Sequence, residues 1–203
     1  MSVTIRKTKG EKTQLPFASA DKIARSIAKE LADRDERISD KTMHPRLTLA
    51  VSEWLKSPDL GAYSPSLSEF SFTDPGQPIR QIWQVHFEMD DLHDGDRVLT
   101  IPAFNPQTKI VAPEVATGVL CFGKLAVIDL LTGKTTCIVN FPTIISEFKN
   151  THPQERRYRV KTINKRENLT VIRMALYFHR QEGNSKPVRV GITSGILAAI
   201  YRK

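Results

Sequence analysis

The sequence contains only two cysteines, Cys121 and Cys137, among its 203 residues. Both lie in apolar stretches, where an unpaired cysteine behaves as a small buried hydrophobe. A disulfide framework is therefore not expected. A metal site would need more ligands at closer spacing, so we predict neither a metal nor a cofactor.

Long apolar runs are missing as well. The longest uncharged apolar stretch falls far short of the roughly 18 residues that a membrane helix needs. Segment 1–12 is basic and polar, and no apolar stretch follows it, so it lacks the pattern of a secretory signal. We therefore expect a soluble, cytoplasmic protein with no membrane partner.

The sequence also lacks the motifs of common active sites. Its five histidines form no His-Glu-x-x-His or His-x-His pair, and no serine lies in a Gly-x-Ser-x-Gly elbow. The glycines are isolated, so no loop is suited to cradle a phosphate. These patterns predict a non-enzymatic protein and identify no small-molecule substrate. A hydrolase with a dispersed site stays an alternative, because catalytic triads assemble from distant positions.

What the sequence does have is positive charge gathered near its end. Residues 151–203 hold twelve lysines and arginines against three acids, a net charge of +9, and the whole chain carries +8. As a strand, segment 155–161 puts alternate basic side chains on one face, and the charge continues into the next turn. The candidate binding residues are Arg157, Arg159, Lys161, Lys165 and Arg166.

Two interpretations of this basic segment stay open. It could bind a polyanion such as DNA or RNA through its phosphates. It could equally be the solvated outer face of a half-buried strand, where charge discourages pairing between sheet edges. The acidic segment 90–96 lacks the ligand spacing of a calcium loop, so we interpret it as a polar hairpin turn.

The first part of the chain has helical periodicity. Apolar residues recur at i, i+3, i+4 and i+7 over 19–35, and a second helix is predicted over about 45–56. Prolines and glycines then cluster in 58–80. We therefore divide the chain into a basic arm (1–17), a helical hairpin (18–57), a linker or long loop (58–80) and a β-sandwich domain (81–203).

From residue 79 onward the pattern is that of strands. Apolar and polar residues alternate over 83–89, and further strands are expected over 98–101, 118–122, 125–130, 135–141, 157–162, 169–179, 188–193 and 196–201. Short strands with turns about every ten residues predict an antiparallel sandwich. The fold class is therefore α+β: a helical hairpin followed by an immunoglobulin-like β-sandwich.

The expected core combines the helical stripe with inward-facing strand residues. The helical residues are Ile23, Ile27, Leu31, Leu47, Val51 and Trp54. The strand residues are Trp83, Val85, Phe87, Leu120, Val127, Ile138, Val160, Ile172, Leu176 and Phe178.

Two blocks, 98–113 and 175–200, carry a resemblance. The first reads Val-Leu-Thr-Ile-Pro-Ala-Phe-Asn-Pro and continues to Ala112-Pro113, and the second begins Ala-Leu-Tyr-Phe-His-Arg-Gln-Glu-Gly-Asn. Over about 79–203 the chain resembles a group of small Bacteroidetes proteins without a known activity. The resemblance implies a bacterial source and a strand around 176–179, but no chemistry.

These features predict a binding or structural module that acts through protein–protein contacts. Two helices alone bury little surface, so the helical stripe must pack on the sandwich, on itself or on another subunit. The expected partner is therefore another protein or a second copy of the chain. The alternative is a nucleic-acid-associated protein that uses the basic face near 156–166.

Overall fold

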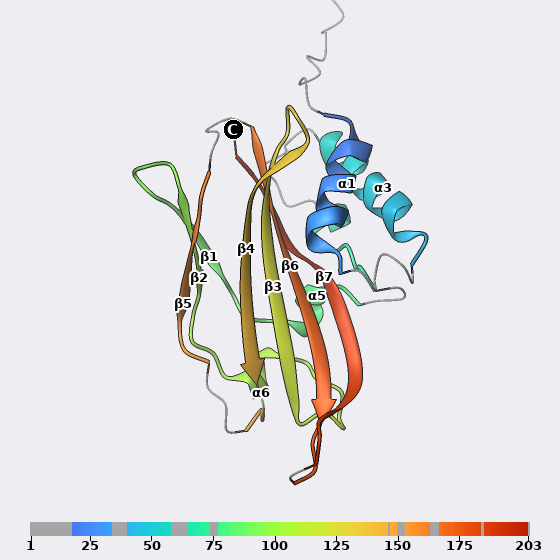
Figure 1. Ribbon diagram of the computed structural model, residues 1–203, viewed down its shortest axis with the longest axis vertical. Coiled ribbons are helices and arrows are strands. Elements are labelled where there is room, and N and C mark those ends of the chain that lie inside the picture. Colours follow the sequence, from blue (N-terminus) through green and yellow to red (C-terminus); the bar gives the residue numbers. More distant parts are fainter. Residues whose placement is uncertain are drawn as a thin grey trace, which may run out of the picture.

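The protein has three layers: helices, a four-stranded antiparallel sheet and a three-stranded antiparallel sheet (Figure 1). The computed structural model describes residues 18–33, 40–57, 65–73, 77–145, 147–149, 153–162, 167–183 and 185–202. The α+β class and the antiparallel sheets are therefore confirmed. The predicted basic arm, 1–17, lies outside the described residues.

The helical layer is formed mainly by α1 (Ala20–Leu31) and α3 (Met43–Leu55). The Ser19 side chain accepts a hydrogen bond from the Lys22 amide and caps α1, as small hydroxyl residues commonly do. The helix α3 begins two residues earlier than predicted, because Pro45 is tolerated within a first turn whose amides have no helical partner. The whole predicted helical stripe is buried.

The two helices cover one face of the four-stranded sheet. A hydrogen bond from Ser26 Oγ to the Gly133 carbonyl (2.5 Å) and one from the Ala18 amide to the Leu130 carbonyl (2.7 Å) tie α1 to the turn that follows β3. Gly133 has a φ of +66°, which a glycine adopts at little cost. The helices therefore sit at the end of the sheet nearest this turn (Figure 1).

Segment 58–80, predicted as a linker or long loop, contains packed residues. It includes the short helices α4 (Pro65–Ser68) and the start of α5 (Ile79–Ile82). Leu67 and Phe72 are buried in the core between helices and sheet, and Ile79 is buried on the other side of the sheet. This connection therefore contributes to both cores.

The four-stranded sheet has the order β4-β3-β6-β7. The strands β3 (Gly118–Asp129) and β6 (Asn168–Arg180) are central, and β4 (Lys134–Ile145) and β7 (Val188–Arg202) are the edges. The sequence predicted two shorter strands in place of β3 and two in place of β7. In the structure Gly123 continues β3, and a bulge lets β7 run on without a break.

The three-stranded sheet has the order β1-β2-β5, with β1 at Glu88–Asp91, β2 at Arg97–Ile101 and β5 at Arg156–Val160. The predicted strand over 83–89 is largely wrong. The backbone there pairs instead with the end of the short helix α6 (Pro106–Lys109): the Gln84 amide donates to the Lys109 carbonyl, and the Val111 amide donates to the Ile82 carbonyl.

Two hydrophobic cores lie on opposite faces of the four-stranded sheet. One lies between this sheet and the helices, and the other joins the two sheets. Most predicted strand-core residues are buried. Three are not: Phe87 and Leu120 are only partly buried, and Ile138 is 45% exposed. Ile138 lies on the edge strand β4, on the face opposite Cys137 and Val139, which pack toward the second core.

Candidate functional site

The predicted basic segment forms β5 and the residues just after it. Arg159 Nε lies 2.8 Å from Asp96 Oδ2, and Arg159 Nη2 pairs with the Asp94 carboxylate. Arg157 Nε lies 2.9 Å from Glu155 Oε1, and Lys161 is exposed. Lys165 and Arg166 lie outside the described residues. The acidic turn 90–96 and the basic strand therefore meet in space, through contacts between residues 63 and 65 positions apart in the sequence.

The pairing of Arg159 with Asp96 also affects the pKa of the Asp96 carboxyl. The Thr162 amide donates to Asp96 Oδ1 at 3.0 Å, and this bond, together with the Arg159 guanidinium, lowers the pKa of Asp96 below its ordinary value. The carboxylates of the β1–β2 turn thus offset part of the positive charge on β5. Polyanion binding at this strand stays a prediction. The nearby carboxylates leave the strand with less net positive charge than segment 155–161 alone carries.

A second surface comes from the register of the four-stranded sheet. Residues opposite each other on neighbouring antiparallel strands point to the same face. The pairings place Ala126 with Val171, then Lys124 with Arg173, then Phe122 with Ala175 and Leu120 with Tyr177, in successive rows on the helix-facing side. These rows run from beneath the helices toward the uncovered end of the sheet.

A polar cluster surrounds Asp33, the second residue after the end of α1. The carboxylate of Asp33 lies 2.9 Å from Arg173 Nη2 and 3.1 Å from Lys124 Nζ, and it accepts a hydrogen bond from Tyr177 Oη at 2.8 Å. Arg173 is fully buried, and its guanidinium also lies over the ring of Phe72. The cluster joins the residue just beyond α1 to two central strands.

The pKa of Asp33 reflects this environment. Partial burial on its own would raise the pKa, but the Arg173 and Lys124 charges and the Tyr177 hydroxyl outweigh it and hold the pKa below its ordinary value. The carboxylate is therefore ionised at neutral pH. It fixes the hydroxyl end of Tyr177, whose ring extends into the next part of the sheet face.

Beyond this cluster, none of the described helices covers the helix-facing side of the sheet. We call this surface the open face and define it by Leu120, Phe122, Tyr177 and Ile192. Phe122 and Ile192 are each 42% exposed. Ile192 lies opposite Tyr177 on β7, and Phe122 makes an edge-to-face contact with the Tyr177 ring at 5.6 Å between centroids. The sheet face next to the part covered by α1 and α3 is therefore aromatic and aliphatic.

The open face borders a hollow of about 410 Å³. Leu120, Phe122 and Tyr177 line it on one side, and His179 and Arg189, which lie opposite each other on β6 and β7, line the other. None of the described residues that line this hollow is acidic. The hollow is therefore apolar with a basic border.

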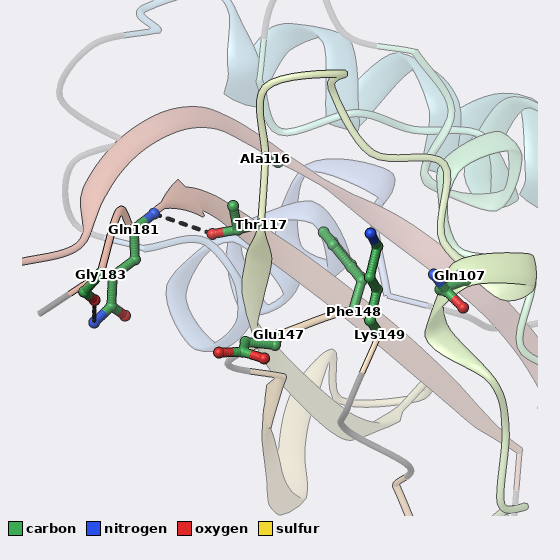
Figure 2. Close-up of a pocket in the computed structure, with 8 residues that line it drawn as sticks. All are labelled: Gln107, Ala116, Thr117, Glu147, Phe148, Lys149, Gln181 and Gly183. Atoms are coloured by element: carbon green, nitrogen blue, oxygen red, sulfur yellow. Dashed lines mark hydrogen bonds between the residues drawn. The ribbon is translucent and has the colours of Figure 1, made fainter.

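A second hollow, of about 530 Å³, lies beside the start of β3 and the end of β6 (Figure 2). Figure 2 shows the hydrogen bond from the backbone N–H of Gln181 to Thr117 Oγ1 beside this hollow, and its length is 3.0 Å. Its two charged side chains, Glu147 and Lys149, are both exposed and opposite in sign. This hollow has neither the apolar continuity nor the single sign of charge that the open face has.

The comparisons add no relatives. No family model, no curated protein and no solved structure matches this chain. Among the residues that the structure describes, no helix is long and apolar enough to cross a bilayer, and no three His, Cys, Asp or Glu side chains gather as a metal site.

The sequence alone does not reveal the open face. It predicts Leu120 as a core residue and predicts no role for Phe122 or Ile192. The alternation in β3 and β6 gave a signal: Phe122 and Tyr177 are large side chains at positions that face the helices. The pattern does not show which of these positions α1 and α3 cover and which they leave exposed.

Proposed function

We propose that the protein is a non-enzymatic binding module that docks an apolar, acidic segment of a partner protein on the open face. The observation that carries the proposal is the exposure of Phe122 and Ile192 on a sheet face whose other half is buried under α1 and α3.

The apolar character supports a protein partner. Single exposed hydrophobic residues are ordinary, whereas a contiguous apolar surface with a polar border is typical of a binding site. Here Leu120, Phe122, Tyr177 and Ile192 come from three adjacent strands and adjoin one another by register. A partner that covered them would remove apolar surface from water, which favours association.

The border charge supports an acidic partner. Arg189 is exposed and His179 lies opposite it, and no acidic side chain lines the hollow among the described residues. Complementary charge speeds encounter and selects against basic partners. The chain's net charge of +8 acts in the same direction.

We propose an immunoglobulin-like sandwich preceded by a helical hairpin. If the strands are lettered A, B, C, C′, E, F and G in chain order, the two sheets read A-B-E and C′-C-F-G, and immunoglobulin-type sandwiches share this grouping of A, B and E against C, F and G. The packing of α1 and α3 in one core supports the hairpin.

The test is a selection from two displayed libraries of 16-residue peptides. Both contain leucine and valine in random order, one with aspartate and glutamate and the other with lysine and arginine. We expect binders from the acidic library only, with affinities measured by fluorescence anisotropy. Phe122→Ser and Ile192→Ser should each weaken those binders at least tenfold, because central apolar contacts carry most of the energy of an interface.

The matched control is Leu49→Ser, which removes a 61% exposed leucine from α3. This variant should bind the selected peptides like the wild type. The proposal is wrong if the acidic library yields no binder, or if the binders are as tight for Phe122→Ser and Ile192→Ser as for Leu49→Ser. Thermal melts of all three variants verify that each is folded.

A further inference from the structure

We infer that the partner segment is an amphipathic α-helix that lies over β3, β6 and β7 and completes the helical layer begun by α1 and α3. The inference rests on the proposed function and names the form of the partner. It follows from the width of the open face, from what covers the rest of this face, from the shape of the nearby sheet edge and from charge.

The width of the open face matches a helix. It reaches from Leu120 on β3 across Tyr177 on β6 to Ile192 on β7, which are opposite one another in register. Two strand spacings of about 4.8 Å give a width of about 10 Å. This is close to the diameter of an α-helix with its side chains, about 10–12 Å, whereas a single added strand would reach only one edge.

The same sheet face already accepts helices. Under α1 and α3, the face presents Ala126, Ile128, Val171 and Ile196 to apolar helical residues such as Ile27 and Trp54. The open face is the continuation of these rows along β3 and β6 (Figure 1). A third helix placed there would bury Phe122 and Ile192 as the first two bury their neighbours.

The adjacent edge of β7 is poorly suited to an added strand. The edge around Ile196 and Leu197 already has hydrogen-bond partners within the chain. The Ile196 amide donates to the Phe70 carbonyl at 2.8 Å, and Arg80 Nε donates to the Leu197 carbonyl at 2.6 Å. Beside the open face, Val190 is the extra residue of a bulge, and Arg189 is exposed. Bulges and charges are devices that discourage strand pairing at an edge.

The floor of the site is held in place before any partner arrives. Tyr177 is fixed at its hydroxyl by Asp33 and at its ring by Phe122. A floor that is already ordered costs little conformational entropy on binding. The helix that fits it would place apolar side chains at i, i+3, i+4 and i+7 toward Tyr177 and acidic side chains toward Arg189 and His179.

Charge also distinguishes this partner from a second copy of the chain. A copy carries the same net charge of +8 and the same Arg189 border. Its amphipathic helices α1 and α3 already bury their apolar stripes against its own sheet. An acidic helix from another protein meets neither obstacle.

The experiment compares two labelled 18-residue peptides of identical composition, built from leucine, glutamate, alanine and glutamine. One has leucines at i, i+3, i+4 and i+7 with glutamates on the flanks, and the other alternates leucine and glutamate. Fluorescence anisotropy with the full chain should show at least tenfold tighter binding of the helical pattern. A proline at the centre of that peptide should abolish binding, because proline breaks a helix.

Each outcome separates the inference from the proposed function. Equal or tighter binding of the alternating peptide would indicate strand addition and overturn the helix. The same conclusion follows if neither designed peptide binds while library-selected acidic peptides do. If the libraries are also empty, the proposed function itself fails. Light scattering that shows a dimer of the peptide-free chain, lost in Phe122→Ser, would assign the open face to a second copy and overturn the inference.

Discussion

The guanidinium of Arg173, fully buried on β6, lies 2.9 Å from the carboxylate of Asp33, the second residue after the end of α1. This contact joins the helical layer to the centre of the sheet at the border of the open face. A buried charge that loses its partner is costly. Substitution of either residue of this pair should therefore lower the free energy of unfolding.

The first prediction concerns Asp33→Asn. The amide cannot balance the charge of Arg173, and we expect a loss of about 2 kcal/mol in the free energy of unfolding, less than for a fully buried pair because Asp33 is partly exposed. Urea denaturation measures it. The control is Asp90→Asn on β1, where the carboxylate is exposed and the change should stay within about 0.5 kcal/mol. Equal effects in the two variants would contradict the role given to Asp33.

The second prediction concerns pH. The pKa of Asp33 is lower in the folded protein than its ordinary value of 3.8, so its ionised form stabilises the fold above that value, and this contribution is lost as pH falls through the lower, folded pKa. The difference in free energy of unfolding between wild type and Asp33→Asn should therefore be full at pH 6 and shrink below about pH 4. Urea titrations from pH 6 to pH 3 test it, and a difference that stays constant would refute it.

The third prediction concerns Gly123, over which the Phe141 ring lies. A Cβ at Gly123 would come within 1.7 Å of Phe141 Cε2, whereas one at Gly191 would have no neighbour closer than 3.6 Å. Gly123→Ala should therefore cost about 2 kcal/mol or more, since forcing an extra carbon into a packed core displaces its neighbours. Gly191→Ala is the control and should change the denaturation midpoint little. Similar midpoints for both variants would show that the ring does not occupy this place.

The fourth prediction concerns Tyr201. Burial and the hydrogen bond from its hydroxyl to the Glu167 carboxylate raise its pKa to about 12, from an ordinary 10. Ultraviolet titration should therefore show a tyrosinate step near pH 12 that is missing in Tyr201→Phe. If the step survives the substitution, Tyr201 is not the residue that titrates there.

The sequence alone predicted the local features that have a clear period. The helical stripe from Ile23 to Trp54 is buried as predicted, and the strand around Leu176 forms as predicted. Alternation failed at Val85, because the backbone around it pairs with the segment after α6 in place of a sheet strand. A period of two gives the direction of side chains but not the pairing partner of the backbone.

The candidate site depended on information that local patterns do not hold. The pairing of Arg159 with Asp94 and Asp96 joins two segments about 65 residues apart, and Asp33 lies 140 residues from Arg173. Phe122 lies beyond the part of the sheet that α1 and α3 cover, and it is exposed. Such contacts depend on how the layers stack in three dimensions. Periodic patterns over short stretches of the sequence do not predict this stacking.

The central claim, that the open face docks an acidic helix, is tested most directly by nuclear magnetic resonance. The isotope-labelled protein is titrated with the helix-patterned acidic peptide, and amide shifts are mapped onto the fold. We predict that the largest shifts cluster at Leu120, Phe122, Tyr177 and Ile192 and are absent in Phe122→Ser. Two results would contradict the claim. One is a set of shifts centred on Arg157, Arg159 and Lys161. The other is the absence of shifts at a peptide concentration of about 1 mM, which corresponds to a binding free energy weaker than about 4 kcal/mol.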